Sequence, residues 1–71
     1  MTIGERIAQC RKNILGIKQI ELAEMCGISR VTLSQYENDQ RDPTLFNAMC
    51  LADIFGVSLD YLAKGKVTTN E

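Results

Sequence analysis

One short pattern occurs three times in this 71-residue chain and constrains where helices end and begin. Each copy has a glycine, an aliphatic residue and a polar residue, followed four positions later by a leucine; the copies begin at Gly16, Gly27 and Gly56. The glycine suits the left-handed conformation that ends a helix. The polar residue stands at the N-cap of the next helix, and the aliphatic residue and leucine form a hydrophobic staple across it. The pattern predicts short helices joined by tight turns.

The first helix is expected to run from Thr2 to about Leu15, where Gly16 ends it. Thr2 and Glu5 have the spacing of a capping box. Apolar residues recur at helical spacing along the expected inner side, namely at Ile3, Ile7, Cys10 and Ile14. The outer side is assigned to Arg6, Gln9 and Asn13.

The remaining helices follow the repeated pattern. The second starts at about Lys18, the third at Ser29 and the fifth at Ser58, and a polar loop at residues 38–43 precedes the fourth helix. Apolar residues lie nearly all round that fourth helix, at residues 45–55. This indicates either a buried central helix or a face shared with a partner chain.

No strand alternation is present in the sequence. We therefore expect an all-α domain of five short helices over residues 1–65. Residues 66–71 have no periodicity and are expected to form a flexible C-terminal tail.

The composition argues against several classes of protein. Apolar residues make up 45% of the chain, a normal globular level, but no run approaches the roughly 18 residues of a membrane span. The N-terminus lacks the basic and apolar regions of a signal peptide, so we expect a cytoplasmic protein. Three cysteines without any histidine offer no metal-ligand spacing. We expect free, partly buried thiols, with redox sensing as the alternative, and no metal, cofactor or enzymatic activity.

The net charge of −1 is unusual for a nucleic-acid-binding domain, which tends to be basic. The charge is unevenly distributed, however. Residues 1–36 carry five basic and three acidic side chains, whereas residues 37–71 carry three basic and six acidic ones. The distribution favours an N-terminal half that faces DNA and a C-terminal half that faces away.

The second and third helices are predicted to form a helix-turn-helix unit. Small Ala23 lies four residues before Gly27, and Ile28 and Leu33 fall where the third helix must face inward. Such a unit leaves the outer side of its second helix free to enter a DNA major groove. On the third helix that outer side carries Arg30, Val31, Ser34 and Gln35.

A longer series of residues resembles the phage repressor and Cro (XRE-like) family, whose domains have the lambda-repressor-like fold. The series covers about residues 3–65 and comprises Ile3 to Lys12, Gln19-x-x-Leu22-Ala23, Gly27-Ile28-Ser29, Thr32-Leu33-x-x-Tyr36-Glu37-Asn38, Pro43, and Leu51-Ala52-x-x-Phe55 through Leu62. The resemblance implies a sequence-specific transcriptional regulator that acts as a repressor. It would bind double-stranded DNA as a homodimer on a palindromic operator.

The resemblance also implies roles for individual residues. Gln19 would bind a DNA phosphate and support the third helix, called the reading helix because it would contact the bases. Ser29 would cap that helix and touch the DNA backbone. Asn38 and Arg41 would contact phosphates beyond it. Contacts to base edges are implied for Arg30, Val31 and Gln35, with Thr32 and Ser34 at the margin. Val31 has a second interpretation, which is packing against the second helix.

Glu37 is implied to be a buried acid that pairs with a basic residue of the first helix, here assigned to Lys12. Lys18 replaces the usual Ser or Thr cap of the second helix, so the first amides of that helix have no side-chain acceptor. Either these amides and the lysine charge face a DNA phosphate, or Lys18 is an ordinary exposed lysine. Asp39 stands where the family commonly has glycine, and Gln40 where a basic residue is frequent. These departures reduce the positive charge near phosphate, so we expect a shallow salt dependence.

The apolar content of the fourth and fifth helices exceeds the needs of one small core. This predicts a dimer interface on these helices, formed by Phe46, Met49, Leu59 and Tyr61. An alternative function of the same fold is a protein-interaction module, such as an antitoxin or co-regulator.

Overall fold

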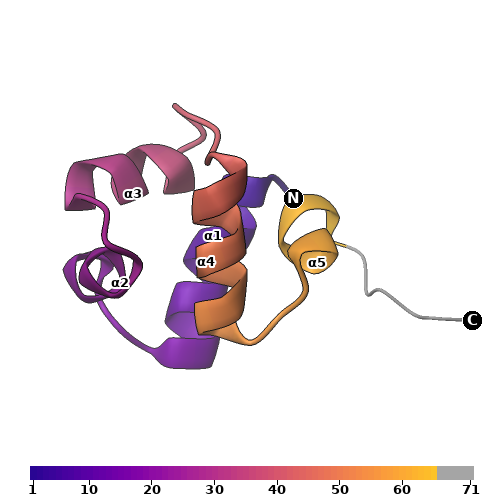
Figure 1. Cartoon of the computed structure of the whole chain (residues 1–71), viewed down its shortest axis with the longest axis horizontal. Coiled ribbons are helices and arrows are strands. Elements are labelled where there is room, and N and C mark those ends of the chain that lie inside the picture. Colours follow the sequence, from indigo (N-terminus) through magenta and orange to yellow (C-terminus); the bar gives the residue numbers. More distant parts are fainter. Residues whose placement is uncertain (66–71) are drawn as a thin grey trace, which may run out of the picture.

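The computed structural model describes residues 1–65, and these residues form helices without any strand. The elements are α1 (Ile3–Cys10), the π-helical turn η1 (Arg11–Leu15), α2 (Gln19–Cys26), α3 (Arg30–Glu37), α4 (Leu45–Phe55) and α5 (Leu59–Lys64). The predicted all-α class with five helices is confirmed. In Figure 1, α4 crosses in front of α1, with α2 and α3 on one side and α5 on the other. The predicted tail, residues 66–71, lies outside the described residues.

The repeated pattern lies at the starts of α2, α3 and α5, as predicted. Gly27 and Gly56 adopt positive φ angles of 73° and 74° and end α2 and α4. The hydroxyls of Ser29 and Ser58 accept hydrogen bonds from the third amide of the following helix. The three leucines of the pattern, Leu22, Leu33 and Leu62, are completely buried and meet in one core. The same local signal therefore both starts a helix and anchors it.

The end of the first helix differs from the expectation, because the α-helix gives way to a π-helical turn after Cys10. The Gly16 amide donates to the Arg11 carbonyl, five residues back instead of four. This wider turn carries one extra residue and rotates the residues after it. Ile14, assigned to the core, is 51% exposed, and Leu15 packs against the core in its place.

The sequence pattern places Arg6 on the solvent-facing side, but the structure shows that this prediction is wrong. Its side chain is only 7% exposed and donates to the carbonyls of Leu62 (2.8 Å), Ala63 (2.8 Å) and Met1 (2.7 Å). The last carbonyls of a helix lack intrahelical donors and carry partial negative charge, which a guanidinium satisfies. Arg6 thus fixes the end of α5 to α1, and Figure 1 shows the N-terminus beside α5.

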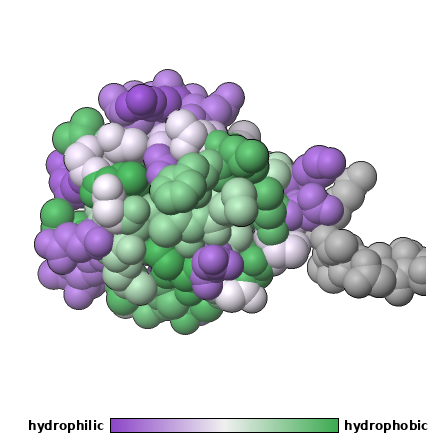
Figure 2. All heavy atoms as spheres, viewed as in Figure 1, coloured by the Kyte–Doolittle hydropathy of each residue, from purple (hydrophilic) through white to green (hydrophobic). Residues whose placement is uncertain are grey.

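The fourth helix is central but is not buried all round. Its inner residues Ala48, Leu51, Ala52 and Phe55 are buried. Its outer residues include Leu45, Phe46 and Met49, which are 68%, 77% and 51% exposed. Figure 2 shows apolar surface over the α4 region of this face. Burial of α4 all round is therefore wrong, and a face shared with a partner chain stays a prediction.

The thiols of Cys10, Cys26 and Cys50 are free, as predicted, and the first two are buried. Burial raises the pKa of Cys10, against the lowering effect of Arg6. Burial, together with the neighbouring Cys50 thiol, raises the pKa of Cys26 to about 12. Within residues 1–65, no cluster of His, Cys, Asp or Glu could hold a metal ion, and no helix is long and apolar enough to cross a membrane.

Candidate nucleic-acid interface

Helices α2 and α3 form the predicted helix-turn-helix unit. Ala23 is 1% exposed, so its small side chain lets the following turn and α3 approach α2 closely. The amide of Ile28 donates to the Ala23 carbonyl at 3.0 Å, which closes the turn at Gly27. Leu33 and Tyr36 are buried, so the inner side of α3 is fixed to the core. The other side of α3 faces away from the domain.

That outer side of α3 carries the predicted reading residues. Arg30 and Val31 are exposed, and an exposure of 59% for Val31 does not favour its second interpretation, packing against α2. Ser34 and Gln35 are partly exposed one turn further along. A cation, an aliphatic group and two neutral hydrogen-bonding groups are therefore presented together.

The predicted pairing of Glu37 with Lys12 is wrong, because Glu37 pairs with Arg11. The guanidinium of Arg11 donates to both carboxylate oxygens, Nε at 2.8 Å and Nη2 at 3.0 Å, and Nη1 donates to the Ile17 carbonyl at 2.9 Å. Arg11 faces the domain interior, whereas Lys12, the next residue on the turn, faces solvent. The planar fork of arginine also matches a carboxylate better than an ammonium does.

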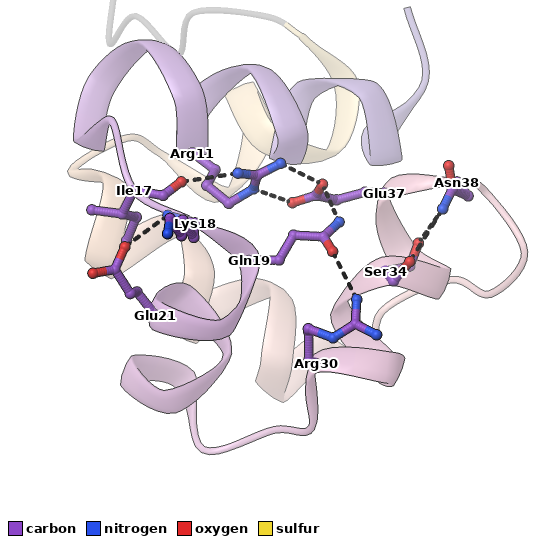
Figure 3. Close-up of polar contacts among 9 residues, drawn as sticks. All are labelled: Arg11, Ile17, Lys18, Gln19, Glu21, Arg30, Ser34, Glu37 and Asn38. Carbon is purple, nitrogen blue, oxygen red and sulfur yellow. Dashed lines mark hydrogen bonds and ion pairs between the residues drawn. The ribbon is translucent and has the colours of Figure 1, made fainter.

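The ion pair extends through Gln19 to the reading helix (Figure 3). Gln19 Nε2 donates to Glu37 Oε1 at 2.9 Å, which turns the amide oxygen of Gln19 outward. That oxygen accepts a long hydrogen bond, 3.4 Å, from Nη1 of Arg30. A half-buried glutamine therefore links the interior ion pair to an exposed arginine of α3.

The start of α2 has no side-chain acceptor of its own. Lys18 occupies the N-cap in an extended conformation, and its amide donates to Glu21 Oε1 at 2.8 Å. This is half of a capping box, because lysine has no acceptor that could receive the N3 amide. The first amides of α2 lie beside the exposed Lys18 and the half-buried Gln19.

The segment after α3 presents the remaining predicted contacts. Asn38 Nδ2 donates to the carbonyl (2.9 Å) and hydroxyl (3.3 Å) of Ser34, so the amide folds back along α3. Asp39 adopts a positive φ angle of 60°, a conformation that glycine adopts without strain. Its carboxylate accepts a hydrogen bond from the Thr2 hydroxyl at 2.8 Å. Arg41 is exposed in the loop.

Ser29 and Thr32 flank the start of α3. The Ser29 hydroxyl accepts from the Thr32 amide at 3.0 Å and donates to the Thr32 hydroxyl at 2.9 Å. Both side chains therefore support the first turn of α3 and remain at its surface. In the network of Arg11, Glu37 and Gln19, Arg11 is the residue to which the sequence pattern assigned no role.

The residues predicted for dimerisation lie outside the helix-turn-helix unit, on α4 and α5. Phe46 and Met49 are exposed on α4, whereas Leu59 and Tyr61 are half-buried on α5. Of these two, Tyr61 packs against the core. In Figure 1, α5 lies on the side of α4 opposite to α2 and α3. A partner on α5 would leave the helix-turn-helix unit uncovered.

Known proteins are similar to this chain in sequence and fold. A family model described as Helix-turn-helix matches residues 7–62. Repressor protein C2 of Salmonella phage P22 is 39% identical over 66 residues, 93% of this chain and 30% of that protein. The HTH-type transcriptional regulator ImmR of Bacillus subtilis is 39% identical over 62 residues, 87% of this chain and 48% of that protein. The chain spans less than half the length of either relative.

Solved structures agree with these relatives. The crystal structure of the P22 c2 repressor in complex with a synthetic operator matches with a TM-score of 0.87, 39% identity, and coverage of 93% of this chain and 98% of that one. The N-terminal DNA-binding domain of SinR from Bacillus subtilis matches with a TM-score of 0.78 at 33% identity, over 84% and 87% of the two chains. These relatives are regulators rather than enzymes. The chain belongs to the phage repressor (XRE-like) helix-turn-helix family.

Proposed function

We propose that this protein is a sequence-specific transcriptional repressor that binds double-stranded DNA as a homodimer, with α3 in the major groove. The observation that carries the proposal is the polar outer side of α3, held by a chain of hydrogen bonds to the interior. Glu37 fixes Gln19, and Gln19 in turn accepts a hydrogen bond from Arg30. The reading helix is therefore oriented before DNA arrives, which reduces the entropy that binding must overcome.

The chemistry of the reading residues suits base edges. The Arg30 guanidinium can donate to O6 and N7 of guanine, and the Gln35 amide can bind N6 and N7 of adenine. The exposed methyl groups of Val31 suit a thymine methyl. Each good bidentate pair discriminates against the wrong base by about 1–3 kcal/mol. Thr32 and Ser34 lie at the margin of this surface.

Contacts to the DNA backbone come from both ends of the helix-turn-helix unit. Lys18 and Gln19 at the start of α2 face one phosphate region, together with the Ser29 hydroxyl. Asn38 and Arg41 face the next region beyond α3. Few of these side chains are charged, so the binding constant depends on salt less steeply than for a strongly basic domain.

Dimerisation places two reading helices on one operator. Half-sites one helical turn apart, about 34–36 Å, would match a two-fold dimer on a palindrome. The proposed interface comprises Phe46 and Met49 of α4 with Leu59 and Tyr61 of α5. The exposed Phe46 supports this surface, because a large aromatic side chain gains most from being covered.

The uncovered apolar face of α4 also supports the second candidate, a protein-interaction module. A complex of SinR with SinI is among the similar structures, at 31% identity and a TM-score of 0.82. If this chain is a protein-interaction module, its main partner is another protein.

Selection of bound DNA from a random duplex pool separates these candidates. We expect enrichment of a palindrome, with Arg30→Ala and Gln35→Ala each relaxing selection at a different position of the half-site. Lys64→Ala, on exposed α5 away from α3, is the matched control and should select the wild-type site. Absence of any enriched sequence with folded wild-type protein would refute the proposed function. Unchanged selection by both α3 variants would refute this reading face.

A further inference from the structure

A half-buried asparagine of α4 contacts the inner side of the reading helix. Asn47 lies in the first turn of α4, and its Nδ2 donates a hydrogen bond of 2.9 Å to the hydroxyl of Tyr36. Tyr36 belongs to the last turn of α3 and is only 2% exposed. In Figure 1 the end of α3 lies beside the start of α4. The bond therefore joins α4 directly to the end of α3.

The side chain of Asn47 does not serve the cap of its own helix. In α1 and α2 the same position carries Glu5 and Glu21, which accept hydrogen bonds from the amides of the capping residues. In α4 the backbone amide of Asn47 donates to the Thr44 hydroxyl at 3.1 Å, whereas its side-chain amide reaches across to Tyr36. The cap thus fixes the backbone of Asn47 and leaves the side chain for the contact with α3.

The two ends of α3 are held by different partners. Near the start of the helix, Arg30 donates to Gln19 of α2 at 3.4 Å. Near its end, Tyr36 accepts from Asn47, and Gln35 stands directly before this tyrosine in the chain. The hydroxyl is the outermost atom of the tyrosine side chain, so a bond at this atom resists both rotation of α3 about its axis and displacement of its end. A helix held only at its start would pivot there and move most at its end.

We propose that Asn47 is a positioning residue for sequence reading, which acts through Tyr36 to fix the end of α3 and with it the side chain of Gln35. Asn47 itself contacts the inner side of α3 and no base. This inference rests on the proposed function, in which Arg30 and Gln35 contact different bases of one half-site. Because Arg30 lies at the start of α3, its base contact does not depend on Asn47.

The test selects bound DNA from the random duplex pool with Asn47→Ala, with Tyr36→Phe and with the double variant. Each single variant should relax selection at the half-site position identified by Gln35→Ala and keep it at the position identified by Arg30→Ala. Operator affinity should fall about fivefold per half-site, the lower limit for one bidentate base contact. Affinity for a random-sequence duplex should stay at the wild-type value, because it depends on charge and neither substitution changes the charge.

Two comparisons separate positioning from a general loss of stability. Ala63→Gly, at an exposed position of α5, should lower the melting temperature but keep wild-type selection. The double variant should lose no more operator affinity than either single variant, because all three lack the same bond. Tyr36→Phe keeps the buried aromatic ring, so this variant remains folded, and binding is measured below the melting temperature of every variant.

The outcomes distinguish this inference from the function on which it rests. Wild-type selection in both single variants, while Arg30→Ala and Gln35→Ala relax theirs, would overturn the role of Asn47 and leave the proposed function intact. Equal relaxation at both half-site positions, an equal loss on the random duplex, additive losses in the double variant, or relaxed selection by Ala63→Gly would also overturn it. Wild-type protein that enriches no sequence would overturn both.

Discussion

Replacing Arg6 by methionine should strongly destabilise this domain, although the residue looks like a surface arginine in the sequence. Methionine keeps most of the buried stem but removes all three hydrogen bonds of the guanidinium. The carbonyls of Leu62 and Ala63 then lie at the end of α5 without a donor. Hydrogen bonds from a charged donor contribute about 1.5–3 kcal/mol each.

The three bonds are not equivalent. The Leu62 carbonyl is buried and takes the full loss, the Ala63 carbonyl is partly buried, and Met1 is exposed enough for water to replace the guanidinium. Counting the first bond fully and the second in half gives a loss of about 3 kcal/mol. A domain of this size has a total stability of about 3–10 kcal/mol. The melting temperature should therefore fall by about 12 °C or more.

Urea unfolding followed by helical circular dichroism measures this loss. Lys64→Met is the matched control, because it removes a cation from the same helix end but from solvent, and it should change stability by less than about 0.5 kcal/mol. Hydrogen exchange in the Arg6 variant should increase first in α5, which loses its attachment to α1. Equal stabilities of Arg6→Met and Lys64→Met would refute the reasoning.

Three further perturbations test other parts of the fold. Arg11→Met should cost about 3–5 kcal/mol because it leaves a buried carboxylate without its cation, whereas Lys12→Met should be nearly neutral, as urea midpoints will show. Gly4→Ala should lower the melting temperature, although alanine favours helix, because its Cβ would collide with the Tyr36 carbonyl oxygen. Burial and the Cys50 thiol raise the pKa of Cys26 from 9.0 to about 12, so the unfolded chain releases this proton first. Stability should be unaffected by this group below pH 9 and fall between about pH 9 and 12, a decline that Cys26→Ala removes.

Each of these predictions has an outcome that contradicts it. Equal losses in the Arg11 and Lys12 variants would restore the pairing expected from sequence. A Gly4→Ala protein as stable as wild type would mean that α1 can move away from the end of α3 without cost. Parallel alkaline unfolding curves for wild type and Cys26→Ala would show that this thiol does not drive the decline. Cys10→Ala should remove part of the decline as well, because burial also raises the pKa of Cys10.

The helix boundaries were predictable because their signals are local. A glycine, a capping hydroxyl and a staple leucine act within about two turns of chain, and Ser29 and Leu33 took the predicted places. The role of Arg6 was not predictable in this way. Its partners are 56 and 57 residues away, at a helix end whose position only the tertiary fold determines.

The prediction of the partner of Glu37 was wrong for a related reason. Sequence placed two adjacent cations, Arg11 and Lys12, on the first helix, and neighbouring helical positions point in different directions. Which one faces inward depends on the exact rotation of the helix near Cys10, where the π turn begins. The outer face of α3 was easier to predict, because it required only that Leu33 and Tyr36 face inward.

The π turn also means that one residue could be deleted from the first helix without moving the residues at its two ends. Ile7 and Cys10 lie at helical spacing, and an uninterrupted α-helix would place the next inward residue at position 14. The extra residue moves that place to Leu15. Deleting exposed Ile14 would bring Leu15 into the α-helical register and leave Gly16 at the helix end. The segment between Arg11 and Gly16 is therefore a site where chain length can change by one residue while both of its ends keep their contacts.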